Sequence, residues 1–196
     1  DGSKVFPSTD IKGGVAVSLY DESRSFGKIG VFTSFKELNS LIKRVVDAVD
    51  RFKPLSEILN GNTSYKYSKS LFDENPQFDQ ILSGGSRRYL ASSVFDAIPD
   101  VFFDKKHEGS VDYVLIQGRQ NSKRIAKYIK RAYLQYHNNL DKYKVLLPSS
   151  NGSGAIGEVL STPLIGEPST GHTETYISFG AFDHRTTAEN LMKYLK

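Results

Sequence analysis

The sequence contains no cysteine, no tryptophan and a single methionine among its 196 residues. The absence of cysteine excludes disulfides and thiolate metal ligands, and it suits a protein of the reducing cytoplasm. The four histidines show no metal-ligand spacing such as H-E-x-x-H, so we do not expect metal catalysis. No apolar run approaches the roughly 18 residues that a membrane span needs, and the start, DGSKVFPSTD, lacks the layout of a signal peptide. The remaining composition is typical of a globular protein of one domain or two small ones.

The apolar pattern predicts an α+β fold in which most strands are short. Residues 15–32 predict a β-hairpin, and a helix is expected to follow, because Ser34 and Glu37 form a capping-box pair ahead of apolar residues at helical spacing. Residues 54–110 alternate short apolar stretches with Asn, Gly, Ser and Pro, which indicates irregular structure with short helices. Further strands are expected at 111–117, 143–147, 158–165 and 173–179, and further helices at 122–136 and from Thr186 onward.

Positive charge is concentrated in one part of the sequence. The net charge is +4, but residues 119–144 contain eight basic residues and one acid, so this segment carries +7 and the rest of the chain −3. The eight are Arg119, Lys123, Arg124, Lys127, Lys130, Arg131, Lys142 and Lys144. Such a patch attracts phosphate or another anionic partner, but it is equally typical of the solvated face of a helix. Tyrosines in the segment can stack on bases or lie in the core, and we expect the core for Tyr133.

The stretch NGSGAIGEVLSTP (residues 151–163) contains the glycine spacing G-x-G-x-x-G at residues 152–157. A dinucleotide turn needs a strand before it and a helix that starts within it, so that the helix N-terminus meets the pyrophosphate. Here a Pro-Ser-Ser loop follows the expected strand, and the residues after Gly157 are β-branched and end at Pro163. We therefore expect a loop with exposed backbone amides and no cofactor.

Two other polar motifs have simple structural explanations. Residues 75–78, N-P-Q-F, approach the Asn/Asp/Ser-Pro-Pro-aromatic motif of enzymes that methylate exocyclic amines of DNA bases, but glutamine replaces the second proline. A turn before a short helix is expected there. Residues 172–175, H-T-E-T, alternate between the two faces of the expected strand, which argues against a nucleophile and its base. They fit a strand edge that presents polar groups to a ligand or to solvent.

Two longer segments carry a family resemblance, VFPSTDIKGGVAVSLYD (residues 5–21) and YKVLLPSSNGSGAIGEVLSTPLIGEPSTGHTETYISFG (residues 143–180). They resemble the C-terminal half of adenine-specific DNA methyltransferases from bacterial type II restriction-modification systems, and the tail AENLMKYLK (residues 188–196) is similar too. In that family the D-I-K-G-G-V strand lies at the end of the methyltransferase core, after the catalytic motif, and a target-recognition domain follows it. Residues 75–78 lie after D-I-K-G-G-V, so their likeness to the catalytic motif is a coincidence.

The resemblance implies that residues 1–52 are the end of the methyltransferase core and residues 53–196 a target-recognition domain that reads double-stranded DNA. Catalytic, cofactor-binding and metal-binding residues would be absent from this cytoplasmic fragment; the parent enzyme would bind S-adenosylmethionine and supply the catalytic domain as a partner. The expected DNA contacts are Arg119, Lys123, Arg124, Lys127, Lys130, Arg131, Asn151, Ser153, His172, Thr173 and Glu174. Two alternatives stay open: an independent nucleotide-binding enzyme that uses residues 152–157, and a protein-interaction module that docks through residues 15–32.

Overall fold

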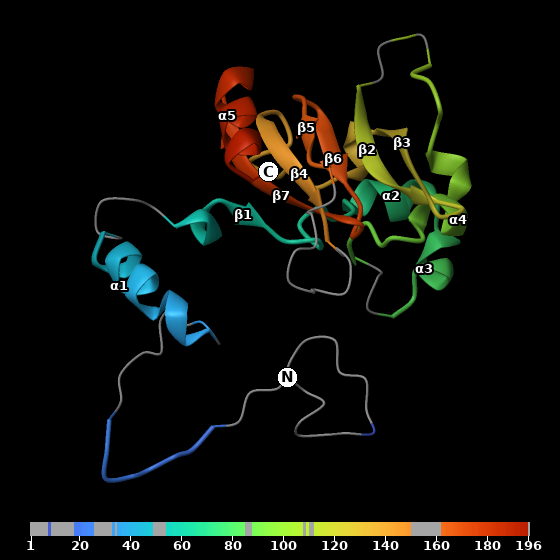
Figure 1. Ribbon diagram of the computed structural model, residues 1–196. Helices are drawn as coiled ribbons and strands as arrows, with labels where there is room; N and C mark the ends of the chain where they lie inside the picture. The colour runs from blue at the N-terminus through green and yellow to red at the C-terminus, as the bar shows by residue number, and fades with distance from the viewer. Residues whose placement is uncertain are drawn as a thin grey trace. The chain divides into compact units, whose positions relative to one another are not determined.

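The computed structural model describes residues 8, 18–25, 33, 35–48, 54–84, 88–107, 109, 112–149 and 162–195. Contacts within the chain divide it into two units, Asp1–Pro54 and Leu55–Lys196. Figure 1 labels the helices and strands of each unit.

The first unit contains one regular helix, α1 (Asn39–Ala48), preceded by a single 3₁₀ turn, η2 (Lys36–Leu38). This confirms the helix expected after the capping-box pair. The apolar residues recur at helical spacing, as expected for an amphipathic helix, but Leu41, Val45 and Val46 are 52%, 64% and 46% exposed. Residues 18–20 are not in a strand, and residues 15–17 and 26–32 of the expected hairpin lie outside the described residues.

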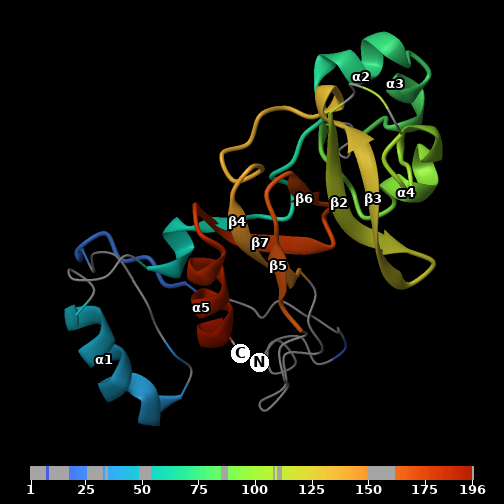
Figure 2. The same cartoon turned by 90° about the horizontal axis from the view of Figure 1, so that it is seen from above.

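The second unit contains two β-sheets and several short helices (Figure 2). The four-stranded sheet has the order β1 (Leu59–Asn60), β7 (Tyr176–Phe182), β4 (Tyr143–Pro148), β5 (Leu164–Gly166). The three-stranded sheet has the order β3 (Lys123–Lys130), β2 (Tyr113–Gln120), β6 (Thr170–His172). Neighbouring strands are antiparallel, except that β6 runs parallel to β2. The helical elements are η4 (Leu55–Glu57), α2 (Lys69–Glu74), α3 (Phe78–Ile81), α4 (Val94–Ala97), η6 (Pro99–Val101), η7 (Arg131–Tyr133) and α5 (Arg185–Leu195).

The α+β class is therefore confirmed, and most elements lie where the sequence places them. The strands at 111–117 and 143–147 correspond to β2 and β4, the C-terminal helix to α5, and the irregular region to three helices of four to six residues. The strand expected at 173–179 begins later, at Tyr176, because residues 173–175 form the connection between β6 and β7. Only the end of the strand expected at 158–165 lies within the described residues, in β5.

The helix expected at 122–136 is wrong. The segment forms β3 and the single turn η7, and β3 pairs with β2 along all eight of its residues. Asn121 and Ser122 make the connecting turn with φ of 49° and 61°, the two left-handed residues of a type I′ hairpin turn. Ile125 and Ile129 misled the prediction, because a spacing of four residues fits one face of a strand as well as one face of a helix.

The core of the second unit lies between the three-stranded sheet and the short helices. Val114, Ile116 and Ile129 on one face of the β2–β3 hairpin are completely buried, as are Leu71 of α2 and Phe95 of α4. The N-P-Q-F stretch is the expected turn, with α2 ending before it and α3 beginning at the buried Phe78. Tyr133 is in the core, as expected, at 4% exposure.

Candidate functional site

The tip of the β2–β3 hairpin presents two arginines to each other. The strand register places Arg119 directly opposite Arg124, one pair before the turn. Since hydrogen-bonded and non-hydrogen-bonded pairs alternate, and the pair that closes a two-residue turn is hydrogen-bonded, Arg119 and Arg124 occupy the closer, non-hydrogen-bonded type. Both are exposed, and within the described residues neither they nor the neighbouring Lys123 form an ion pair. Like charges directly opposite each other repel, so this pair favours an anion between or above them.

The two arginines line an open pocket of about 520 Å³, which we call the hairpin-tip pocket. Ser149 at the end of β4 and the Glu174–Thr175 connection form another part of its lining. These two segments are joined, because the Ser149 N–H donates to the carbonyl oxygen of Thr175 at 2.8 Å and the Ser149 hydroxyl donates to that of Glu174 at 2.7 Å. The Glu174 carboxylate accepts the Ser92 N–H at 3.4 Å. The pocket therefore combines two guanidinium groups that have no ion-pair partner among the described residues with a hydrogen-bonded carboxylate and hydroxyl groups.

Two other basic residues of the predicted interface are neutralised by acids from distant parts of the sequence. Lys127 lies 3.5 Å from a carboxylate oxygen of Asp104, and its side chain is only 17% exposed. Lys130 lies 3.5 Å from Glu74 and donates to the Tyr133 hydroxyl at 3.2 Å. The hydrogen bond from Tyr133 also lowers the pKa of Glu74, which keeps this pair charged. Their positive charge is already compensated, so they attract an external anion less than the hairpin tip does.

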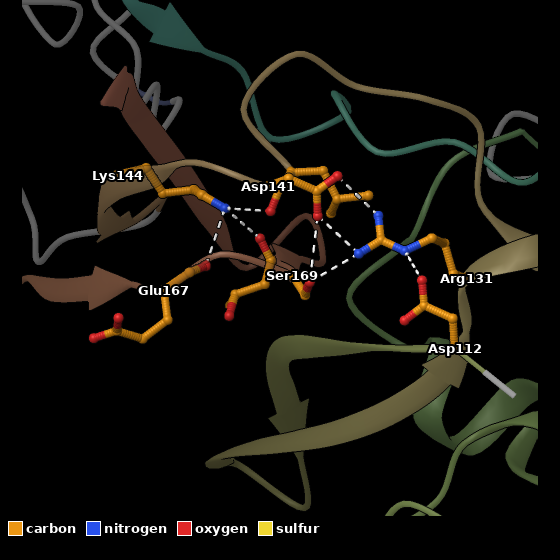
Figure 3. Close-up of polar contacts among 8 residues, drawn as sticks. Asp112, Arg131, Asp141, Lys144, Glu167 and Ser169 are labelled. Atoms are coloured by element: carbon orange, nitrogen blue, oxygen red, sulfur yellow. Dashed lines mark hydrogen bonds and ion pairs between the residues drawn. The ribbon is translucent and has the colours of Figure 1, made fainter. Parts of the chain in front are cut away.

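Arg131 is held in a polar cluster (Figure 3). Its guanidinium donates twice to Asp141, at 2.7 and 3.0 Å, and once each to Asp112 and the Ser169 hydroxyl. The hydrogen bonds from Arg131 lower the pKa of Asp141. These hydrogen bonds join the end of β3 to the start of β2 and to the β5–β6 connection. Arg131 therefore stabilises the fold and is not available to an external anion.

Lys144 belongs to the same region and is completely buried. Its ammonium donates to the carbonyl oxygens of Thr170, Leu140 and Glu167 at 2.6, 3.1 and 3.5 Å. Burial lowers the pKa of Lys144 to about 7. The charge of residues 119–144 therefore overstates the basic surface. Of its eight basic residues, Lys144 is in the interior and Arg131 is paired with Asp112 and Asp141.

The remaining expected contacts divide into three groups. His172 and Thr173 are completely buried, and the His172 ring bonds to the Thr173 carbonyl at 3.0 Å and to the Ser178 hydroxyl at 3.1 Å. Burial lowers the pKa of His172 to about 4, so it is neutral at pH 7. The polar residues expected at a strand edge are thus in the interior, where the His172 ring also packs edge-on against Tyr65, and neither residue reaches the surface. Glu174 does reach the hairpin-tip pocket, and Asn151 and Ser153 lie outside the described residues.

A second, smaller pocket was not expected from the sequence. It has a volume of about 210 Å³ and lies on the face of the β2–β3 hairpin opposite the core, and we call it the sheet-face pocket. Its lining includes Tyr113, Leu115 and Gln117 of β2, Tyr128 of β3 and Ile165 of β5. The alternation of β2, whose odd-numbered residues share one face with Arg119, indicates half of this pocket. The other half comes from β3, which the sequence analysis predicts as a helix.

Membrane spans and metal sites are not found in the part of the chain that the structure describes. Among those residues, no helix is long and apolar enough to cross a membrane, and no three side chains of His, Asp or Glu are gathered as metal ligands. Comparison with protein-family models, with curated proteins and with solved structures gives no match to this chain.

Proposed function

We propose that the chain is the DNA-recognition part of a site-specific adenine-N6 DNA methyltransferase of a bacterial type II restriction-modification system, and that it has no catalytic site of its own. The methyltransferase assignment rests on the resemblance of residues 5–21 and 143–180 to that family. The observation that supports DNA binding is the pair formed by Arg119 and Arg124, which faces a pocket without an ion-pair partner in the described residues. In this proposal S-adenosylmethionine binds to the parent enzyme and not to this chain.

The two arginines would hold a backbone phosphate of the duplex. Guanidinium groups bind phosphate oxygens in a bidentate manner, and two of them opposite each other match a single phosphate or two adjacent ones. Lys123 adds a further free charge beside them. Phosphate contacts fix the register of a protein on DNA but do not read its sequence. Glu174, in the same pocket, is suited to accept a hydrogen bond from a cytosine amino group.

Duplex binding by the purified chain at several salt concentrations tests this proposal. We expect Arg119→Gln with Arg124→Gln to weaken binding to all duplex sequences and to reduce the salt slope by about 0.9 for each phosphate that is no longer neutralised. The matched control is Lys69→Gln, which removes a lysine of α2 that is 89% exposed and lines neither the hairpin-tip pocket nor the sheet-face pocket. Equal affinity and equal salt slope for the double variant and the control would refute the proposed interface.

The exposed apolar side of α1 supports a contact with the catalytic domain of the same polypeptide. A helix whose apolar face is open to solvent marks a protein-protein contact when the apolar residues are contiguous, as Leu41, Val45 and Val46 are. The same observation favours a protein-interaction module as the second candidate function. Val45→Glu should abolish co-purification with the catalytic domain and leave duplex affinity unchanged; a loss of both would assign α1 to the DNA interface.

The nucleotide-binding alternative depends on residues 152–157, which lie outside the described residues. Calorimetric titration of the chain with S-adenosylmethionine, NAD and ATP separates it from the proposed function. We expect no heat of binding, and tight stoichiometric binding of any of the three would replace the proposal with a nucleotide-dependent activity.

A further inference from the structure

We propose that the sheet-face pocket binds one unpaired base of DNA, so that the chain recognises a single-stranded or locally opened strand beside the hairpin tip. This inference rests on the proposed DNA-binding function and names a second, separate contact for it. In duplex DNA, stacking buries both faces of a base and pairing occupies its Watson–Crick edge, so only a base that has left the stack can occupy a pocket on a protein surface.

The pocket has the size and lining that a base needs. A cavity of about 150 Å³ holds a benzene ring, and the sheet-face pocket has about 210 Å³. The register places Tyr128 opposite Leu115, and Ile165 of β5 forms part of the wall. An aromatic ring beside aliphatic side chains offers the flat, apolar surface on which bases stack.

Tyr128 is partly exposed and lines the pocket. The Lys106 ammonium lies 5.5 Å from the centre of this ring, and Lys106 is an exposed side chain with no ion pair among the described residues. A base can displace it, and the ammonium can then pair with the phosphate of the same nucleotide. Glu167, the acid at the pocket, is paired with Arg185 and therefore repels that phosphate less.

Gln117 supplies a polar group that can distinguish bases. Gln117 lines the pocket, and its side-chain amide forms no hydrogen bond with another described residue, although Gln120 of the same strand bonds to Asp96 at 2.7 Å. A free amide offers a donor and an acceptor together, which suits the N6 and N7 edge of adenine. The amide therefore favours adenine over a base without that pattern.

The two pockets lie along one strand and can hold one continuous DNA strand. Gln117 and Arg119 are on the same face of β2, about 7 Å apart. Tyr128 and Arg124 are four residues apart on the same face of β3, about 13 Å, so a strand whose base stacks on Tyr128 can reach the two arginines with its neighbouring phosphates. A cationic surface next to a stacking ring is the combination that proteins use for single strands.

Fluorescence anisotropy of the full chain with a labelled short single-stranded oligonucleotide, and with the same sequence as a duplex, tests the inference. We expect Tyr128→Leu to weaken single-strand binding by about fivefold to hundredfold and to leave duplex binding unchanged. Tyr128→Phe should retain single-strand binding, because it keeps the ring. The matched control is Tyr136→Leu, which removes a tyrosine that is 86% exposed and lies outside both pockets.

A Tyr128→Leu effect no larger than that of Tyr136→Leu would overturn the inference, as would an equal loss of single-strand and duplex binding. Thermal unfolding of each variant shows whether it folds. If Tyr128→Leu does not fold, Gln117→Leu is the deciding variant. The wild-type chain should bind oligo(dA) more tightly than oligo(dT), and Gln117→Leu should remove that preference. Failure of the proposed function looks different, because wild-type duplex binding would then be absent or unaffected by Arg119→Gln with Arg124→Gln.

Discussion

Reversing one charge of the arginine pair should stabilise the fold and weaken DNA binding at the same time. In Arg124→Glu the residue opposite Arg119 becomes a carboxylate, so a repulsive cross-strand pair becomes an attractive one. Surface substitutions usually change the free energy of unfolding by less than about 0.5 kcal/mol. A larger gain in stability here would follow directly from the register of the β2–β3 hairpin.

The magnitude follows from the position of the pair. Cross-strand pairs contribute roughly 0.2–1 kcal/mol each, so replacing repulsion with attraction should raise the free energy of unfolding by about 1 kcal/mol. For a unit of this size, a gain of about 1 kcal/mol raises Tm by about 3 °C. The gain should be largely lost at about 1 M salt, where the screening length falls to about 3 Å.

Urea unfolding at low and high salt, with duplex binding measured in parallel, checks this prediction. Lys123→Glu is the control, because Lys123 faces the uncharged Gln120 and its reversal should weaken DNA binding without the gain in stability. The reasoning is refuted if Arg124→Glu is no more stable than Lys123→Glu at low salt, or if its duplex affinity equals that of the wild type.

Three further substitutions test the fold around the site, each by urea unfolding. Ser122→Gly should stabilise by about 0.5 kcal/mol, since Ser122 has φ of 61°; a loss of stability would argue against the type I′ turn. Gly180→Ala should cost about 2 kcal/mol, because Gly180 has φ of 83° and its new Cβ would meet the Phe182 ring. Burial lowers the pKa of Lys144 to about 7. Above that pH the lysine is neutral in the folded chain and protonated in the unfolded chain, so the free energy of unfolding should rise from about pH 7 to 9. Lys144→Met should flatten that rise, and an unchanged slope would assign it to another group.

The sequence predicts the elements whose signal is local. The helical spacing of apolar residues identifies α1 and α5, although α5 begins at Arg185, before the cap expected at Thr186, and the apolar run at 143–147 identifies β4. The helix prediction for residues 122–136 is wrong because the four-residue spacing of Ile125 and Ile129 fits one face of a helix and one face of a strand equally well. The Asn121–Ser122 pair, a turn signal between two runs of strand-forming residues, was the information that could have decided it.

The candidate site was predictable only in part, because charge in a sequence does not show which charges are compensated. Arg119 and Arg124 remain free of ion pairs with the described residues, whereas Lys130 is paired with Glu74, more than fifty residues earlier in the chain. Likewise, nothing near His172 indicates that its ring will pack edge-on against the ring of Tyr65, which lies more than a hundred residues earlier in the chain, at 4.7 Å between the ring centres. Contacts between distant segments decide which charges are paired and whether His172 is buried. A local sequence pattern does not show such contacts.

The pairing of β1 with β7 has a consequence for how the second unit folds. Leu59 and Phe179 are partners in this short ladder although about 120 residues separate them. Closing so long a loop has a large entropic cost, and a two-residue strand returns little for it, so the ladder should form late, after the local β2–β3 hairpin. The two segments near the ends of the unit would then be brought together last, around a β2–β3 hairpin that is already complete.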